Sequence, residues 1–136
     1  MRKLLLVDDE DALLRSLARL LRSVSYDVVT TDGLGALDRL GRETFDAIIT
    51  DLRMPQVTGF DILAAARRLA GRTPVIVMSG SAEIHDAVTA MRAGARDFLI
   101  KPVAFKALEE VLDAVLGPNA APNTPPPEPD PLAWRD

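Results

Sequence analysis

Short apolar runs alternate with longer amphipathic stretches along residues 1–116 of the chain. The apolar runs are rich in leucine or β-branched residues and are mostly uninterrupted by polar ones. They occupy residues 4–7, 28–29, 47–49, 75–78 and 98–100. Strands that are buried on both faces have this composition, which is typical of a parallel sheet. The pattern therefore predicts five buried strands.

The stretches between these runs have the spacing of amphipathic helices, with apolar residues recurring at intervals of three and four. Their apolar positions are Leu13, Leu17, Leu20, Leu21 and Val24, then Leu34, Leu37 and Leu40, then Ile62, Leu63, Ala66 and Leu69, then Ile84, Ala87, Val88 and Met91, and finally Phe105, Leu108, Val111, Leu112 and Val115. Gly71, Gly94 and Gly117 follow the last three stretches, and glycine is a common helix stop signal. Each strand is thus predicted to be followed by a helix.

This succession predicts an α/β fold. Right-handed crossovers give a doubly wound parallel sheet with helices on both faces. Two orders of five strands are reasonable, and the flavodoxin-like order 2-1-3-4-5 is the common compact one. The folded unit is expected to span residues 1–116. Seven of the ten prolines come after Gly117, so residues 117–136 are expected to form a disordered proline-rich tail or linker.

Polar side chains stand at the carboxyl ends of four predicted strands. Asp8 and Asp9 follow the first strand, and Asp51 follows the third. Ser79 follows the fourth strand and Lys101 the fifth. The carboxyl ends of parallel strands share one edge, and the first and third strands are neighbours in the predicted order. We therefore expect these side chains to meet in one crevice.

Three carboxylates in one crevice need a compensating cation. Two of them about 4 Å apart repel by roughly 4 kcal/mol at an effective dielectric constant of about 20. A lysine or a protonated carboxyl offsets part of this, and a divalent cation offsets more. The ligands are hard oxygen atoms without His or Cys nearby, so Mg²⁺ is expected rather than zinc. Its open coordination positions suit phosphoryl chemistry.

Each of these residues also has a simpler interpretation when it is taken alone. Asp9 or Asp11 could cap the following helix. Ser79 could be a hydrogen bonder at a strand end, and Lys101 could be a solvated surface charge. The occurrence of the whole set at one edge favours a functional site.

Four motifs resemble the receiver domains of two-component response regulators. They are LLLVDDE at 4–10, DLRMPQVTGFDIL at 51–63, VIVMSGS at 75–81 and AMRAGARDFLIKP at 90–102. The resemblance covers residues 4–116 and implies a signalling switch rather than an enzyme. A sensor histidine kinase or a phosphotransfer protein would phosphorylate Asp51, and the acyl phosphate would later be hydrolysed.

The resemblance also implies a metal site around Asp51. Asp9 would bind Mg²⁺ directly, Asp8 would act mostly through water, and the backbone carbonyl of Arg53 would be a further ligand. Arg53 occupies a position that varies in the family. As a hypothesis, its side chain sets the phosphoryl lifetime by shielding or orienting the attacking water, which a comparison with Arg53→Ala would test.

The switch residues implied by the resemblance lie on the last two strands. Lys101 would pair with a phosphoryl oxygen, with a cis peptide bond between Lys101 and Pro102. Ser79 would move toward the phosphoryl group and Phe98 would turn into the space that it leaves. Phe98 lacks the hydroxyl of a tyrosine, so no hydrogen bond would report its position. The repacked face, formed by the fourth helix, fifth strand and fifth helix, would bind a partner or a second copy of the chain.

Three other classes fit the residues less well. Phosphatases with an aspartyl nucleophile need Asp-x-Asp-x-Thr, whereas residues 8–12 read DDEDA. A flavodoxin-like cofactor carrier needs a Ser/Thr/Gly phosphate loop, whereas the loop here is acidic. A receiver-like interaction module that takes no phosphate would not need the intact set of Asp8, Asp9, Asp51, Ser79 and Lys101.

Composition limits the classes of partner and the location that are expected for this chain. A net charge of −4 without a basic run argues against nucleic-acid binding by this chain alone, and the absence of cysteine excludes disulfides. The apolar runs are far shorter than the about 18 residues of a membrane span, and the N-terminal run is too short for a secretory signal. A cytoplasmic location is expected. The length also resembles that of a stand-alone regulator, whereas the proline-rich tail could equally be a linker to a DNA-binding or ATPase domain. Residues 78–102 resemble receivers of transcriptional activators, which favours transcription regulation through an output domain, and the sequence leaves open whether this domain exists and which one it is.

Overall fold

The computed structural model describes residues 1–80 and 83–117. The strands are β1 (Lys3–Val7), β2 (Asp27–Thr31), β3 (Ala47–Asp51), β4 (Val75–Ser79) and β5 (Asp97–Ile100). The helices are α1 (Asp11–Ser23), α2 (Gly33–Leu40), α3 (Gly59–Leu69), α4 (Ile84–Arg92) and α5 (Phe105–Leu116). Apart from Gly117, the predicted proline-rich tail lies outside the described residues.

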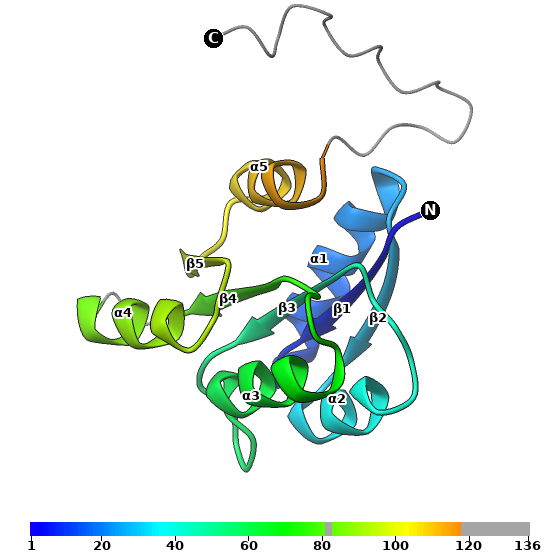
Figure 1. Ribbon diagram of the computed structural model, residues 1–136. Helices are drawn as coiled ribbons and strands as arrows, with labels where there is room; N and C mark the ends of the chain where they lie inside the picture. Colours follow the sequence, from blue (N-terminus) through cyan, green and yellow to red (C-terminus); the bar gives the residue numbers. More distant parts are fainter. Residues whose placement is uncertain (81–82, 118–136) are drawn as a thin grey trace, which may run out of the picture.

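The five strands form one parallel sheet in the order β2-β1-β3-β4-β5, which confirms the predicted fold. Helices cover both faces of the sheet (Figure 1). Helices α1 and α5 pack on one face and α2 and α3 on the other, while α4 lies beside the edge strand β5. Within the described residues, no helix combines the length and apolarity needed to cross a bilayer.

Alternation along the strands divides the core between the two faces. On β1, Leu5 and Val7 pack with α2 and α3, whereas Leu4 and Leu6 pack with α1 and α5. Residues of β1, β3 and β4 are almost wholly buried because each of these strands has a neighbour on both sides and helices above and below. This buried centre fixes the positions of the three strand ends that carry the polar residues.

The predicted apolar helix faces are only partly buried. Leu20, Leu34 and Leu69 are exposed. The largest departure is α4, whose predicted apolar residues include Ile84, Val88 and Met91, all exposed, while its buried residues are Asp86 and Ala90. Helical periodicity identifies an apolar side but not whether another element covers it, and α4 turns this side away from the sheet.

Candidate functional site

The sheet register brings two of the aspartates together. Val7 of β1 pairs with Thr50 of β3, so the next residues, Asp8 and Asp51, lie side by side at the carboxyl edge. Asp9 completes the group: one carboxylate oxygen from each of the three lies within 4.8 Å of the others. Asp8 and Asp51 are 1% and 5% exposed, whereas Asp9 is open to solvent. The acidic crevice is therefore buried at its floor and accessible at its rim.

Lys101 provides the compensating charge. Its Nζ donates to Oδ2 of Asp8 at 2.8 Å and lies 3.2 Å from Oδ1 of Asp51. The Lys101 side chain is only 19% exposed, so the interpretation as a solvated surface charge is wrong. The backbone amide of Lys101 donates to the carbonyl of Ser79 at 2.7 Å, and the bond to Pro102 is cis. These contacts hold the end of β5 beside the crevice.

Burial and charge shift the ionisation of the two central groups in the same direction. Burial, and then the neighbouring carboxylate of Asp8, raise the pKa of Asp51, and Lys101 only partly opposes this. Burial by itself would lower the pKa of Lys101, but its hydrogen bond to Asp8 and the charges of both aspartates raise the pKa overall. The lysine is thus held in its charged form between two carboxylates.

Capping of α1 does not explain the acidic residues that precede and begin this helix. The N-cap residue is Glu10, which makes no side-chain capping hydrogen bond. The backbone amide of Glu10 donates instead to Oδ1 of Asp8 at 3.1 Å. Neither Asp9 nor Asp11 is the N-cap residue, so the interpretation of either one as that helix cap is wrong.

The remaining expected residues surround the crevice at different depths. Ser79 is fully buried at the end of β4. Phe98 of β5 is partly buried and packs against the core cluster on the α2–α3 face. Arg53 follows Asp51 by two positions, and its guanidinium donates to Asp86 of α4 at 2.8 Å. The roles expected of Ser79, Phe98 and Arg53 in switching and lifetime stay predictions.

Sequence reasoning missed the residues that support the loop after Asp51. A Cβ on Gly59 would lie 2.7 Å from the carbonyl oxygen of Asp51 and 2.8 Å from Cα of Leu52, so the close approach requires glycine. Thr58 and Asp61 form a capping box at the start of α3. The signal was present in the sequence, because Thr58 precedes an acidic residue by three positions just before an apolar helix.

The donor set fits a hard divalent cation. Three carboxylates supply oxygen ligands, and they converge from two neighbouring strand ends. Mg²⁺ prefers such ligands and retains several waters, which an open rim at Asp9 accommodates. The same crevice holds a cation at Lys101 and a buried carboxylate at Asp51, so it can also receive an anionic phosphoryl group.

Comparison with known proteins relates the chain to response regulators. The family model for the response regulator receiver domain matches residues 4–113. The transcriptional regulatory protein GlrR of Escherichia coli K12 is 40% identical over 118 residues, which cover 86% of this chain and 27% of GlrR. The chain thus spans about a quarter of the length of this relative.

Two solved structures are similar over most of the chain. The receiver domain of the sensor histidine kinase PA1611 from Pseudomonas aeruginosa PAO1 has a magnesium ion in its active-site cleft; it is 29% identical, with a TM-score of 0.78, and the match covers 86% of this chain and 98% of that one. A response regulator from Burkholderia pseudomallei has a phosphorylated aspartic acid, a calcium ion and citrate; it is 29% identical, with a TM-score of 0.76 and coverage of 85% and 66%. With the family match, the sheet order and the crevice of Asp8, Asp9 and Asp51 in agreement, this chain belongs to the response regulator receiver domains.

Proposed function

We propose that this domain is a phosphoacceptor switch in which Asp51 takes a phosphoryl group from a phosphohistidine. The observation that carries the proposal is the position of Asp51, which is buried with Nζ of Lys101 3.2 Å from its Oδ1 and with carboxylate oxygens of Asp8 and Asp9 within 4.8 Å. The donor is a sensor histidine kinase or a phosphotransfer protein, and the exchange is expected in the cytoplasm.

The residues that would hold Mg²⁺ are Asp8, Asp9 and Asp51, with the backbone carbonyl of Arg53. A bound Mg²⁺ would neutralise charge on the phosphoryl oxygens. The magnesium ion in the active-site cleft of the PA1611 receiver supports a divalent cation at this position.

The transfer needs little covalent chemistry from the protein. An Oδ atom of Asp51 attacks phosphorus and a P–O bond forms. The P–N bond to the donor imidazole breaks and its electron pair stays on that nitrogen, so a phosphohistidine that is protonated on its other ring nitrogen leaves as neutral imidazole. Lys101 faces the site where negative charge gathers and stabilises it. The switch is turned off by hydrolysis. Water attacks phosphorus, the P–O bond to Asp51 breaks, and inorganic phosphate leaves.

The phosphoryl group offers new acceptors to the end of β4 and to Lys101. Ser79 would move toward it, and Phe98, which is only partly buried, would turn inward. This repacking biases the domain between two arrangements of α4, β5 and α5.

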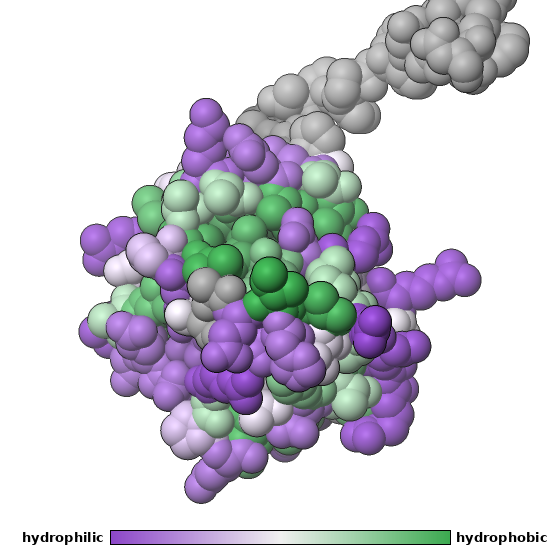
Figure 2. All heavy atoms as spheres, turned by 90° about the vertical axis from the view of Figure 1, so that its left-hand side faces the viewer, coloured by the Kyte–Doolittle hydropathy of each residue, from purple (hydrophilic) through white to green (hydrophobic). Residues whose placement is uncertain are grey.

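An exposed apolar surface lies on the moving elements. Ile84, Val88 and Met91 of α4 and Ile100 of β5 are between 41% and 79% exposed. Figure 2, which faces this side of the molecule, shows apolar side chains gathered over it. Such a patch suits a protein partner or a second copy of the chain. Because GlrR is a transcriptional regulator much longer than this chain, we expect an output in transcription regulation.

The experiment is incubation with phosphoramidate and Mg²⁺ followed by intact mass. The wild type is expected to gain one phosphoryl group, and Asp51→Asn to gain none. Asp38→Asn, which removes an exposed carboxylate on α2, is the matched control and should behave as the wild type. Phosphoryl gain by Asp51→Asn at the wild-type rate would show that another residue is the acceptor. No gain by the wild type would favour an interaction module without phosphoryl chemistry.

A further inference from the structure

Asp86 is a buried carboxylate that the phosphoacceptor site does not use. Within residues 1–80 and 83–117 the buried carboxylates are Asp8, Asp51 and Asp86, and the first two belong to the crevice. Asp86 is 4% exposed and lies on α4. A carboxylate with so little access to water needs a counter-ion, because burial of an unpaired charge strongly destabilises the folded state.

The counter-ion of Asp86 comes from the phosphoacceptor loop. Nη2 of Arg53 donates to Oδ1 of Asp86 at 2.8 Å, although the two residues are 33 positions apart. Arg53 follows Asp51 by two positions and is itself 62% exposed. Its main chain therefore stands beside the phosphoacceptor while its side chain holds α4.

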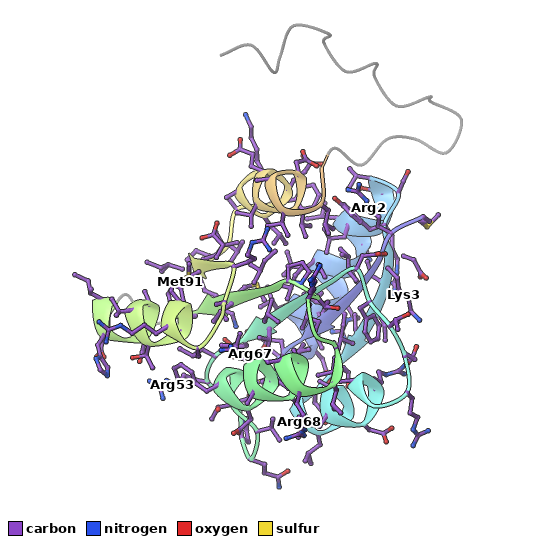
Figure 3. The ribbon with its side chains drawn as sticks, in the orientation of Figure 1. Arg2, Lys3, Arg53, Arg67, Arg68 and Met91 are labelled. Carbon is purple, nitrogen blue, oxygen red and sulfur yellow. The ribbon has the colours of Figure 1, made fainter. Side chains whose placement is uncertain are left out.

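Helix α4 has few other anchors. It buries two residues, Asp86 and Ala90, and presents Ile84, Val88 and Met91 to solvent. At its other end, Nη1 of Arg67 donates to the carbonyl of Ala93 at 3.3 Å. Figure 3 shows Arg53 and Arg67 between α3 and α4, with Met91 on the opposite side of the helix. The apolar attachment of α4 is small, because it consists of the buried Ala90 and of Ala93, which packs against the same core cluster at the helix end. The Arg53–Asp86 ion pair therefore supplies a large part of the attachment of α4.

We propose that the Arg53–Asp86 ion pair is a charge clamp that holds α4 in the unphosphorylated position and that phosphorylation of Asp51 releases it. This inference rests on the proposed function of Asp51. Phosphorylation replaces the single negative charge of the Asp51 carboxylate by about 1.5 to 2 negative charges on the phosphoryl oxygens, two residues away from Arg53. The phosphoryl group and Asp86 then compete for one guanidinium. When Asp86 loses its counter-ion it must regain water, and α4 moves outward to expose it.

The clamp couples the site to the partner surface by charge. It acts in addition to the movements expected of Ser79 and Phe98 and needs no tyrosine at position 98. Asp86 is a positioning residue in this scheme, because it acts through Arg53 and does not touch the phosphoryl group. When the contact of Asp86 with Arg53 breaks, the exposed apolar side of α4 moves together with the buried side, since both belong to the same short helix.

Amide hydrogen exchange of α4, followed with intact-mass measurement of phosphorylation, tests the clamp. The protein is compared with and without beryllofluoride and Mg²⁺, which mimic the phosphorylated state. In the wild type, exchange in residues 84–92 should become faster on addition of the mimic. Asp86→Asn and Arg53→Gln should each speed this exchange about fivefold without the mimic, since the Arg53 end of the pair is exposed to solvent, and should respond little to it. The double variant should match the single ones, because both remove the same contact.

Two variants separate the clamp from a general loosening of α4. Arg67→Gln removes the contact at the other end of the helix and should leave the response to the mimic intact. Arg53→Lys keeps a cation and should retain most of the wild-type protection. The clamp is refuted if exchange in α4 is the same in Asp86→Asn as in the wild type, if the effects of the two substitutions add, or if the variants respond to the mimic as the wild type does. Failure of the wild type to gain a phosphoryl group would instead refute the proposed function, and the exchange without the mimic would still report on the ion pair.

Discussion

Replacement of Lys101 by methionine tests how the crevice balances its charges. Methionine keeps the aliphatic stem but leaves Asp8 and Asp51 facing each other, with 1% and 7% of their side chains exposed. The lysine–carboxylate contacts, at 2.8 and 3.2 Å, correspond to roughly 6 and 5 kcal/mol of Coulomb attraction at an effective dielectric constant of about 20. Much of this is offset by desolvation, so removal of one buried partner is expected to lower the free energy of unfolding by about 3–5 kcal/mol at neutral pH.

The loss should depend on pH in a defined direction. The folded-state pKa of Asp51 already lies above its ordinary value of 3.8, because of burial and then Asp8. A proton on Asp51 therefore stabilises the folded state, and this contribution grows as the pH falls through the folded-state pKa and levels off below 3.8. Without Lys101 the folded-state pKa of Asp51 rises further. The deficit of Lys101→Met relative to the wild type should then shrink on acidification.

The assay is urea unfolding across a pH series, with and without Mg²⁺. Mg²⁺ should stabilise Lys101→Met more than the wild type, because the lysine no longer repels the ion. Lys3→Met is the matched control: Lys3 pairs with Glu43 at the surface, and its loss should cost less than about 1 kcal/mol without a Mg²⁺ effect. A deficit of Lys101→Met that is independent of both pH and Mg²⁺ would refute the charge balance described for the crevice.

Three further predictions concern the same edge of the sheet. Gly59→Ala should lower the free energy of unfolding by about 1–3 kcal/mol in urea titrations, because its Cβ would meet the backbone of Asp51 and Leu52; a neutral effect would show that the loop moves freely. Thr58→Ala should cost about 1 kcal/mol by loss of the capping box, and Thr58→Ser should restore most of it. Mg²⁺ at 100 times its dissociation constant should stabilise the wild type by about 2.7 kcal/mol, measured by urea unfolding; Asp9→Asn should largely remove this gain, and an unchanged gain would show that Asp9 is not a ligand.

The sheet and the crevice could be predicted from the sequence because both depend on strong local signals. Unbroken apolar runs identified the buried strands, and parallel pairing then placed Asp8, Asp51 and Lys101 at one edge. The predicted order made the first and third strands neighbours, so residues that are distant in sequence were expected to meet. The chemistry of the site was therefore available before any side chain had been positioned.

The Arg53–Asp86 pair could not be predicted in the same way. Asp86 lies in a helix whose apolar residues suggested that the opposite side was buried. Packing against β5 and the contact with Arg53 decide which side of α4 faces the sheet. Neither of them is reflected in the helical periodicity of apolar residues. The same holds for Gln56, whose positive φ of 68° follows from the course of the loop rather than from a residue type that favours it.

The edge strand β5 has four residues, and its outer side lies beside the exposed surface of α4 and Ile100. So short an edge strand can form few main-chain hydrogen bonds with a strand of another chain, and association by strand addition is therefore disfavoured. Recognition here must rest on side chains, which can be exchanged one at a time without disturbing the sheet. Duplicated copies of such a domain could therefore acquire different partners, and remain insulated from one another, through a few surface substitutions.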